Sequence, residues 1–496
     1  MSSAIKGYSM QLDQLLSVIN VEAPKGILVQ DLAIDSRLVQ QGSLFMAYPG
    51  ECVDGRSYIA AAVDSGAVAI LYEASNYGLA GDEISGLSIP VFAVNGLRNT
   101  VGAIANEFFQ QPSSDLQVFG VTGTNGKTTC CYLLTQALSK LDMQAAMIGT
   151  IGNGQLNNLA TASHTTPDAV AVHRLLAQWR DQGITQVCME VSSHALDQCR
   201  VGGVNFFCTL FTNLTQDHLD YHDDMSSYRH AKERLFTDYA SELVVTNADD
   251  AMGSSLIDIA NSDFIASYGR QDGDVRLEEI KLRESGMELF IEANQIDFEV
   301  STSLVGDVNV PNILLLVTTL LSLSVDIGDI QRIVSQLQAA PGRMELYSAS
   351  DEPSVVVDYA HTPDALEKAL LSIKQHCDGE VWCVFGCGGD RDQSKRPLMG
   401  EVVARLADHV VITNDNPRTE PAESIVRHID EGINNRKTRT VTLDRAAAIS
   451  ETINKAKTND WVLIAGKGHE TTQQIGKEKL PFSDRQKVTQ CLGVAA

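Results

Sequence analysis

Short apolar runs recur along the chain, and most of them end in glycine or polar residues. Between residues 116 and 340 the runs are "LQVFGV", "AAMIGTI", "QVCMEV", "FFCTLFTNL" and "ELVVTN", with helical segments between most of them. Such alternation is typical of a parallel sheet whose strands are joined by crossover helices. The pattern therefore predicts an α/β fold for this section.

Two further sections flank it. Residues 1 to about 100 contain β-like runs at 26–29, 67–71 and 91–94, which predict a small α/β unit. After residue 340 the alternation resumes in "SVVVDYA", "VWCVFGCGG", "HVVITNDNP", "RTVTL" and "WVLIAGKG". A two-residue period over 286–306 predicts a hairpin added to the central sheet. Because 496 residues exceed one hydrophobic core, we predict three domains, 1–100, 101–340 and 341–496.

Composition excludes several classes of protein. The formal charge of −25 argues against a partner that is nucleic acid or a membrane surface, because such partners select basic faces. The N-terminus lacks an apolar signal core, and the longest apolar stretch, 313–323, is too short for a membrane span and predicts a buried helix. The ten cysteines show no zinc-ligand spacing, so we expect reduced thiols in a cytoplasmic enzyme.

Candidate chemistry gathers where the predicted strands end. Ligands of parallel sheets bind beyond the carboxyl ends of the strands. In this chain those ends carry the polar segments 122–128, 190–194, 217–222, 358–361, 386–391, 415–418 and 466–470. We therefore expect a reaction in clefts between the three domains.

The segment "GVTGTNGKTT", residues 120–129, fits a phosphate-binding loop. Its ending, Gly126-Lys127-Thr128, matches the usual motif, although Val121 stands where the first glycine is expected. Backbone N–H groups would surround phosphate oxygens, Lys127 would bridge the outer phosphates, and the Thr128 hydroxyl would bind magnesium. The alternative is an ordinary glycine corner between a strand and a helix.

Three other residues suggest metal or phosphate chemistry. Glu190 ends an apolar strand, where a carboxylate can hold magnesium. His218 lies between Asp217 and Asp220 after another strand, although a lone histidine is often purely structural. Lys232 falls on a predicted helix, where the alternative is a solvated salt bridge.

Ten motifs, in this order, resemble those of the Mur ligases of peptidoglycan synthesis and cover nearly the whole chain. They are "GVTGTNGKTT", "MEVSSHAL", "NLTQDHLDYH", "YRHAKERLF", "GDVNVPN", "PGRME", "VVVDYAHTPDAL", "GCGGDRD", "NDNPR" and "AGKGHE". The resemblance implies an N-terminal α/β domain that binds UDP, a central phosphate-loop ATPase with a mostly parallel sheet, and a C-terminal Rossmann-like domain that binds an amino acid.

The resemblance also implies a reaction. ATP would activate the D-Glu γ-carboxylate of UDP-N-acetylmuramoyl-L-Ala-D-Glu as an acyl phosphate, and the amine of meso-2,6-diaminopimelate would attack it. We expect ATP and Mg²⁺ as cofactors, small-molecule substrates as the only partners, and a monomer in the cytoplasm.

The family motifs assign residues to the phosphate chemistry. The catalytic set is Lys127, Glu190, His218 and Lys232. Thr128, Glu190, His218 and Lys232 would hold metal, with Lys232 converted to N6-carboxylysine. The nucleotide would contact Gly123, Thr124, Asn125, Gly126, Lys127, Thr128, Thr129, Asn309 and Arg343. The alternatives are a helix cap at Asn309 and an exposed linker arginine at Arg343.

A second set would bind the UDP-muramoyl peptide. Its members are Ile34, Ser36, Glu51, Cys52, Val53, His164, Thr165, Thr166, Ser192, Gln198 and Arg200. Two places depart from the usual family pattern, which often has His-Gln at Glu51-Cys52 and Asn at His164. Contacts at those places are therefore expected to be altered or made by the backbone.

A third set would bind the incoming amino acid: Arg391, Asp415, Asn416, Pro417, Arg418, Gly466 and Glu470. Diaminopimelate has a carboxylate at its far end that lysine lacks, and an arginine fork suits a carboxylate. Lysine-adding relatives generally lack arginine at the position of Arg418, so this residue favours diaminopimelate. The alternative for Arg418 is a β-turn with a surface arginine.

Other functions remain open from the sequence. A lysine-adding Mur ligase or a folylpolyglutamate synthetase-like ligase would share the phosphate loop, although "NDNPR" and the N-terminal "DSR" count against the latter. A nucleotide switch would share the loop too, but "TNAD" at 246–249 lacks the lysine of a guanine-selective NKxD element.

Overall fold

The structure is a computed structural model that describes residues 7–51, 53–75, 86–433 and 439–494. It divides into two compact units, 1–266 and 267–496, which are described separately. The first unit contains two α/β parts with separate sheets, and the second contains the C-terminal sheet, so the chain has the predicted three-part α/β organisation. Helix α4, Leu97–Phe108, spans the predicted boundary at residue 100, and the exact boundaries stay a prediction.

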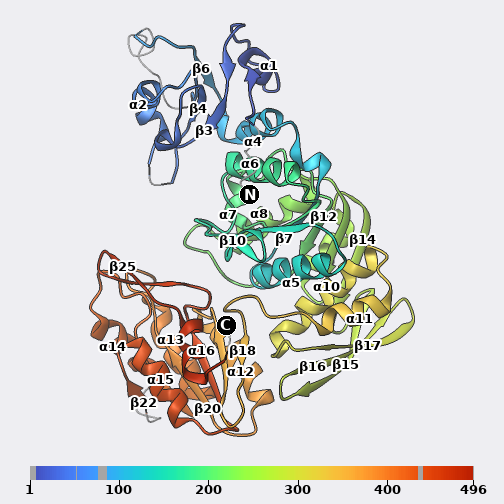
Figure 1. Ribbon diagram of the computed structural model, residues 1–496, viewed down its shortest axis with the longest axis vertical. Helices are drawn as coiled ribbons and strands as arrows, with labels where there is room; N and C mark the ends of the chain where they lie inside the picture. The colour runs from blue at the N-terminus through green and yellow to red at the C-terminus, as the bar shows by residue number, and fades with distance from the viewer. Residues whose placement is uncertain (1–6, 52, 76–85, 434–438, 495–496) are drawn as a thin grey trace. The chain divides into compact units, whose positions relative to one another are not determined.

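The N-terminal part of the first unit is built on four parallel strands in the order β3-β4-β5-β6 (Figure 1). Both central strands are buried along their whole length, which explains their nearly continuous apolar sequence. The elements of this part are β1 (Met10–Gln11), α1 (Leu12–Ser17), β2 (Leu28–Val29), β3 (Asp31–Ala33), β4 (Ser43–Ala47), α2 (Ile59–Asp64), β5 (Ala69–Glu73), β6 (Val91–Val94) and α4.

The second part of the first unit contains the phosphate loop. Its strands follow the order β10-β9-β8-β11-β7-β12-β13-β14, and β8, β11, β7, β12 and β13 are parallel, as the sequence predicted. The strands are β7 (Gln117–Thr122), β8 (Ala145–Gly149), β9 (Gly152–Gln155), β10 (Asn158–Ala160), β11 (Gln186–Glu190), β12 (Cys208–Phe211), β13 (Ser241–Asn247) and β14 (Ser262–Gly269). The helices are α5 (Lys127–Lys140), α6 (Ala169–Asp181), α7 (Ser193–Asp197), α8 (Met225–Thr237) and α9 (Ala251–Ile259).

The second unit begins with an antiparallel ribbon of β15 (Val275–Arg283), β16 (Gly286–Ala293) and β17 (Ile296–Thr302). The predicted hairpin over 286–306 is therefore confirmed. Helices α10 (Val310–Ser322) and α11 (Ile327–Ser335) follow. Helix α10 is buried along most of its length, as its apolar run predicted. None of the described helices is long and apolar enough to cross a membrane.

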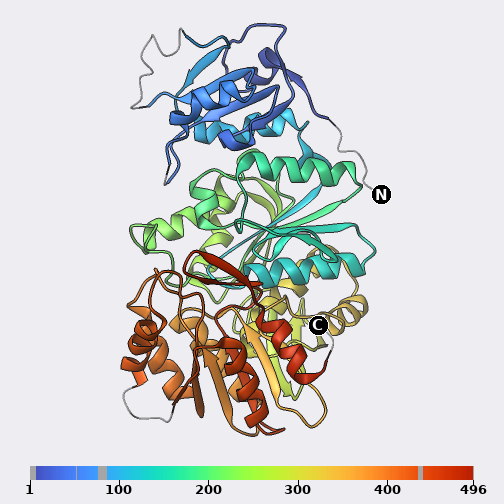
Figure 2. The same cartoon turned by 60° about the vertical axis from the view of Figure 1, so that its left-hand side comes forward.

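The C-terminal sheet has the order β18-β19-β23-β20-β21-β22, parallel except for β18. Figure 2 shows it in orange and red. Its strands are β18 (Glu345–Tyr347), β19 (Ser354–Asp358), β20 (Val381–Phe385), β21 (His409–Ile412), β22 (Arg439–Val441) and β23 (Trp461–Ala465). The remaining elements are α12 (Pro363–His376), α13 (Lys395–Leu406), α14 (Ala422–Ile433), α15 (Arg445–Lys455), a hairpin of β24 (Thr472–Ile475) and β25 (Glu478–Pro481), and α16 (Asp484–Leu492).

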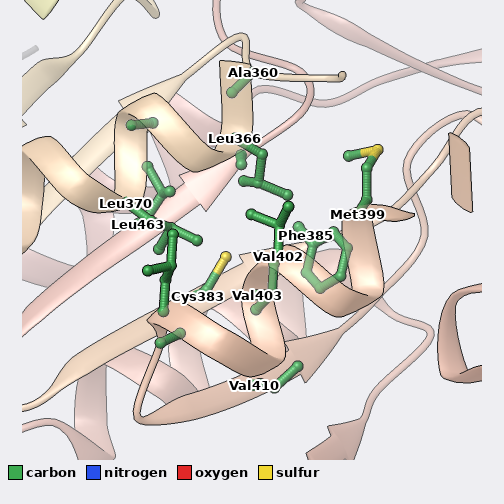
Figure 3. Packing of buried hydrophobic residues seen from close by; sticks show 14 of the residues in the cluster. Ala360, Leu366, Leu370, Cys383, Phe385, Met399, Val402, Val403, Val410 and Leu463 are labelled. Atoms are coloured by element: carbon green, nitrogen blue, oxygen red, sulfur yellow. The ribbon is translucent and has the colours of Figure 1, made fainter. Parts of the chain in front are cut away.

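Apolar side chains cover both faces of this sheet. In the layer shown in Figure 3, Leu366 of α12 and Val403 of α13 pack with Phe385 of β20, and all three are fully buried. A second cluster, which includes Ile449 of α15 and Val488 of α16, covers the other face of the sheet. A sheet covered on both faces leaves its strand ends as the places where polar groups can meet a ligand.

Candidate active site

The phosphate loop joins the end of β7 to the start of α5. Gly123 and Gly126 have φ angles of 148° and 87°, which favour glycine. A Cβ on Gly123 would lie 1.9 Å from the Thr212 hydroxyl oxygen, so a side chain there would collide with the segment after β12. Glycine is therefore required at this position by both conformation and space.

The segment after β12 holds the loop in place. The Thr124 N–H donates to the Asn213 carbonyl at 2.8 Å, and the Asn125 N–H donates to the Asn213 side-chain oxygen at 3.0 Å. The Thr212 hydroxyl donates to the Asn125 carbonyl at 2.6 Å. The first N–H groups of α5, beginning at Lys127, have no acceptor within the helix, and such a helix start attracts anions.

Two lysines converge on one backbone carbonyl of the loop. The Lys127 Nζ donates to the Gly123 carbonyl at 2.8 Å and to the Thr124 carbonyl at 2.8 Å. The Lys232 Nζ, from α8, donates to the same Gly123 carbonyl at 2.7 Å. The loop therefore brings two amines together beside the helix start, where an anionic group would be attracted.

Lys232 is buried, with 1% of its surface exposed, so the alternative of a solvated salt bridge is wrong. Its Nζ lies 4.5 Å from the centroid of the Tyr228 ring, and it forms no ion pair with any carboxylate in the part of the chain that the structure describes. Burial, assisted by the charge of Lys127, lowers the pKa of Lys232 well below its usual range, while Asp217 acts in the opposite direction. The amine is therefore biased toward its neutral, nucleophilic form.

Glu190, at the end of β11, is buried beside the start of α5. One carboxylate oxygen accepts from the Thr128 hydroxyl at 2.8 Å, and the other accepts from the Thr150 N–H at 2.7 Å. The Thr150 hydroxyl also donates to Glu190, at 3.2 Å. A carboxylate and a hydroxyl at this spacing are oxygen ligands that suit Mg²⁺, so Thr128 and Glu190 fit the predicted metal site.

His218 lies in the loop after β12 with a φ of 53°, which is unusual for a residue with a side chain. Its backbone N–H donates to the Asp217 carboxylate at 2.8 Å, and the centroid of its ring lies 4.9 Å from that of the His194 ring. Burial lowers the pKa of His218, while Asp217 opposes the shift. Among the described residues there is no cluster of three or more His, Cys, Asp or Glu side chains arranged to hold a metal.

Five residues of the predicted sugar-peptide set form one hydrogen-bonded chain. The Gln198 amide donates to the Glu51 carboxylate, and the Arg200 guanidinium donates to the Gln198 oxygen at 2.6 and 3.0 Å. Arg200 also donates to the Thr166 carbonyl at 2.9 Å. The Thr166 hydroxyl donates to the Glu190 carbonyl at 2.7 Å and accepts from the Ser192 N–H at 3.1 Å.

The rest of that set is less connected. The Thr165 hydroxyl lies 3.0 Å from the Thr150 hydroxyl, which links it to Glu190. His164 is exposed and lies 3.0 Å from the neighbouring Ser163 hydroxyl. In the described part of the chain, no hydrogen bond joins the rest of the set to Ile34, Ser36 or Val53, and Cys52 lies outside the described residues.

A second polar site lies at the strand ends of the C-terminal sheet. Arg418 follows β21, is half-buried, and donates to the Gly389 carbonyl at 2.7 Å. Its φ of 52° is again unusual for a non-glycine residue. A Cβ on Gly388 would lie 3.0 Å from Arg418 and 3.7 Å from the Arg391 side chain, so both predicted arginines border this glycine.

A buried ion pair holds the two arginine-bearing loops together. Arg396, on α13, is fully buried and forks onto the Glu420 carboxylate at 2.7 and 2.8 Å. Arg396 also donates to the Gly388 carbonyl at 3.1 Å, and Glu420 accepts from the Asp390 N–H at 3.1 Å. Hydrogen bonding to Arg396 lowers the pKa of Glu420 to about 2. Neither Arg396 nor Glu420 belongs to the predicted site residues.

The predicted acceptors of an ammonium lie beside these loops. The Asn416 amide donates to Glu470 at 2.9 Å, and Lys467, which is fully buried, donates to the same Glu470 oxygen at 2.6 Å. Gly466 has a φ of 114°, and a Cβ there would lie 2.8 Å from an Asp415 carboxylate oxygen. The loop residues Pro417 and Gly389 approach so closely that a Cβ on Gly389 would overlap the Pro417 carbonyl at 1.9 Å.

A second buried ion pair holds two strand ends of this site. Arg445 and Asp484 are both fully buried and join at 2.7 Å through two hydrogen bonds. Arg445 also donates to the carbonyls of Ala465, which ends β23, and of Asn414, which follows β21. The pair thus fixes the two strand ends that carry Gly466 and Asp415.

Arg343 and Asn309 of the second unit, which are predicted to contact the nucleotide, both contact residues of their own unit. The Arg343 guanidinium lies 4.4 Å from the Tyr359 ring centroid, and its Nε is buried with no hydrogen-bond partner among the described residues. It is therefore half-buried, not an exposed linker residue. Asn309 occupies the N-cap position of α10, but its side chain donates to the Val305 carbonyl at 2.8 Å and does not cap the helix.

Comparison with known proteins decides the family. Family models match residues 29–109 ("Mur ligase family, catalytic domain"), 121–320 ("Mur ligase middle domain") and 342–468 ("Mur ligase, glutamate ligase domain"). A UDP-N-acetylmuramoyl-L-alanyl-D-glutamate–2,6-diaminopimelate ligase from Coxiella burnetii is 41% identical over 97% of this chain and 99% of its own length. The chain belongs to the Mur ligase family.

Two further relatives carry the same printed name. The protein from Chromobacterium violaceum is 43% identical over 92% of this chain and 93% of its own length. A solved structure of such a ligase is 33% identical, with a TM-score of 0.71, over 98% of this chain and 99% of that one. These matches favour the Mur ligases over the folylpolyglutamate synthetase-like and switch alternatives.

The structure places further residues against the predicted sites that the sequence patterns did not indicate. Thr150 joins Glu190 to Thr165, and Tyr228 contacts both Lys232 and the Thr124 hydroxyl. Lys467 lies within the quoted motif "AGKGHE" but received no role. For Thr150 the available signal was its place in the apolar run "AAMIGTI", directly after the last residue of β8.

Proposed function

We propose that this Mur ligase joins meso-2,6-diaminopimelate to the D-Glu γ-carboxylate of UDP-N-acetylmuramoyl-L-alanyl-D-glutamate, with ATP as the energy source. Relatives with that printed name align over nearly the whole chain. The observation that carries the choice of amino acid is the second site, where Arg418 and Arg391 border Gly388 while Glu470 and Asn416 meet at 2.9 Å. Such a site offers partners to both charges of a zwitterionic head group.

The first chemical step is transfer of a phosphoryl group. A γ-carboxylate oxygen attacks the terminal phosphorus of ATP, the bond to the bridging oxygen breaks, and ADP leaves. The product is an acyl phosphate. Because the carboxylate and the phosphate are both anionic, the step needs positive groups already in place. Lys127 and the start of α5 supply them.

The second step forms the amide. The neutral amine of the amino acid attacks the acyl carbon, a C–N bond forms, and the C–O bond to phosphate breaks. The proton released from nitrogen passes to solvent or to the departing phosphate. Thr128 and Glu190 would hold Mg²⁺, with His218 contributing to a second ion, and the bound metal would neutralise phosphate charge. Asn309 and Arg343 are proposed to contact the nucleotide, as the family motifs imply.

Lys232 is proposed to carry a carbamate. The neutral amine attacks carbon dioxide, a C–N bond forms, one proton leaves, and the group becomes an anion that can orient metal. Its burial and lowered pKa support this reaction, which needs a deprotonated amine. The nitrogen keeps one hydrogen, so its bond to the Gly123 carbonyl can persist.

The carbamate has a direct test. Wild-type protein equilibrated with ¹³C-bicarbonate should show a carbamate carbon resonance that the variant Lys232→Met lacks. A spectrum without that resonance in the wild-type protein would remove the modification from the mechanism while leaving the ligase activity open.

The function itself is tested by the mass of the product. Full-length protein is incubated with ATP, magnesium, the UDP-muramoyl dipeptide and either diaminopimelate or lysine. We expect product mainly with diaminopimelate, and oxygen-18 from a labelled γ-carboxylate should appear in the released phosphate. Product formation without that transfer would contradict the acyl phosphate, and preference for lysine would contradict the assigned amino acid. We also expect a cytoplasmic monomer, which size-exclusion chromatography can test for the oligomeric state.

A further inference from the structure

Lys467 lies in the turn after β23 and has no exposed surface. Its Nζ donates to Glu470 Oε2 at 2.6 Å and to Asn416 Oδ1 at 3.1 Å. The Asn416 amide closes the triangle by donating to the same Glu470 oxygen at 2.9 Å. Fully buried lysines are rare and are normally paired, so the ion pair between Lys467 and Glu470 is a specific part of this site.

The triangle fixes the orientation of Glu470. Two donors occupy Oε2, and in the described part of the chain no hydrogen bond reaches Oε1. Asn416 is itself held, because its Oδ1 also accepts from the Gln474 N–H at 2.9 Å. The Glu470 side chain is 30% exposed, so the remaining oxygen can meet a ligand. A carboxylate held in this way is preorganised to receive an ammonium at one defined position.

The same contact cancels charge. Glu470 carries a negative charge that Lys467 already balances, and Arg418 and Arg391 border the neighbouring Gly388. An amino acid whose far end is a bare ammonium could pair with Asp415 or Glu470, but it would bring no carboxylate to Arg418 and Arg391. A far end that carries both ammonium and carboxylate brings no net charge and can pair with Glu470 and an arginine together.

We propose that Lys467 is a positioning residue that determines specificity: it orients Glu470 and balances its charge, so that the site selects a zwitterionic far end over a bare ammonium. This inference rests on the proposed function. It predicts a role for a side chain that is wholly buried and takes no part in the chemical steps.

The test uses the full-length wild-type protein and the variants Lys467→Met, Glu470→Gln and the double variant, with KM and kcat measured for diaminopimelate and for lysine. Lys467→Met should lower the ratio of kcat/KM for diaminopimelate over lysine by roughly 10- to 100-fold, mainly through KM for diaminopimelate. The KM for ATP should change by less than about twofold. Lys479→Met, at an exposed position on β25, is the matched control and should leave every constant unchanged.

Two comparisons separate this role from a structural one. If Lys467 acts through Glu470, adding Lys467→Met to the Glu470→Gln variant should change the ratio by less than about twofold. Lys467→Gln keeps a donor but removes the charge. It should lower the ratio of kcat/KM for diaminopimelate over lysine, with a smaller rise in KM for diaminopimelate than Lys467→Met causes. Thermal unfolding of each variant identifies loss of the fold, and Lys467→Gln then carries the test if Lys467→Met fails to fold.

The outcomes are distinguishable. An equal loss of activity with both amino acids, or multiplicative effects in the double variant, would overturn the role of Lys467 while leaving the function intact. A wild-type protein that forms no product with diaminopimelate would overturn the proposed function and this inference together.

Discussion

At the phosphate loop the buried Lys232 side chain donates to a backbone carbonyl, whereas at the proposed amino-acid site the buried Lys467 side chain donates to a carboxylate. The same contrast extends to the neighbours. Arg396 and Arg445 in the second site pair with Glu420 and Asp484, while Lys232 has no ion pair with a carboxylate among the described residues.

The difference shows how each site treats charge. Removing a charge from water costs several kcal/mol unless a partner compensates it. In the proposed amino-acid site the protein itself supplies the compensating charges, so its buried side chains are already paired with one another. The phosphate-loop site has a buried amine without such a partner, and an anion or a carbamate would complete it. The buried charges of the proposed amino-acid site are therefore paired within the protein, which suits selection between ligands. The buried amine at the phosphate loop is compensated only when an anion binds or a carbamate forms.

The largest expected effect breaks a compensated pair. Arg445→Met would leave Asp484 charged, buried and alone, and should lower the free energy of unfolding by about 3–5 kcal/mol. Urea denaturation of the full chain measures this change. The control is Arg405→Met, whose partner Glu367 is exposed, and it should cost no more than about 1 kcal/mol. Equal effects of the two variants would contradict the contrast between the sites.

The next effect removes the uncompensated amine. Lys232→Met should lower ligase activity on the order of 10²–10³-fold, because the carbamate that we propose to orient metal at the reacting phosphate cannot form. The same variant should raise the free energy of unfolding at pH 7. Lys455→Met, at an exposed lysine on α15, should change neither quantity.

The stability gained by Lys232→Met should depend on pH in a defined direction. Since the pKa of Lys232 is lowered in the folded state, the unfolded chain binds more protons, and the cost of burying this lysine falls as pH rises toward the unfolded pKa of about 10.4. The stability advantage of Lys232→Met, measured by denaturation at several pH values, should therefore shrink above neutral pH. An advantage that grew with pH would mean that folding raises the pKa of Lys232, which is opposite to the effect of burial.

A smaller effect concerns the pair that joins the arginine loops. Glu420→Gln removes the carboxylate on which Arg396 forks, and should raise KM for diaminopimelate by about tenfold while sparing KM for ATP. The pKa of Glu420 is about 2 in the folded state, so its contribution is present above the unfolded pKa of about 4.3 and is lost as pH falls through 2. Titration of Glu420 should therefore cause no change in the KM of the wild-type protein for diaminopimelate between about pH 5 and 8.

The smallest effect tests the contact between Thr150 and Glu190. Thr150→Val removes the hydroxyl but keeps the N–H that donates to Glu190. We expect a loss of about 1 kcal/mol, seen as roughly a fivefold rise in the magnesium concentration needed for half-maximal activity. Thr458→Val, which removes an exposed hydroxyl, is the control and should leave the magnesium requirement unchanged.

Much of the fold could be predicted from the sequence, because strand period, glycine position and helix spacing are local properties. The β7, loop and α5 arrangement and the β16–β17 hairpin follow from such patterns. The family motifs also brought Glu51, Gln198 and Arg200 into one predicted set, and the structure joins them by hydrogen bonds.

The partners of single side chains could not be predicted in the same way. A lysine in a helical or glycine-rich motif looks solvated, and only the segments packed on it show that Lys232 and Lys467 are buried. Arg396 and Glu420 are 24 residues apart, and nothing in the sequence links them. Burial and pairing depend on contacts between distant segments, which is why the charge balance of each site emerged only from the structure.

His218 and Arg418 both adopt left-handed backbone conformations, with φ of 53° and 52°. Such conformations cost on the order of 1–3 kcal/mol for ordinary side chains and are relieved by glycine or asparagine. A redesign guided only by thermal tolerance would therefore replace these two residues first. Any engineering of this ligase for robustness has to exempt both positions, since the substitutions that most relax the chain there would erase an imidazole at one site and a guanidinium at the other.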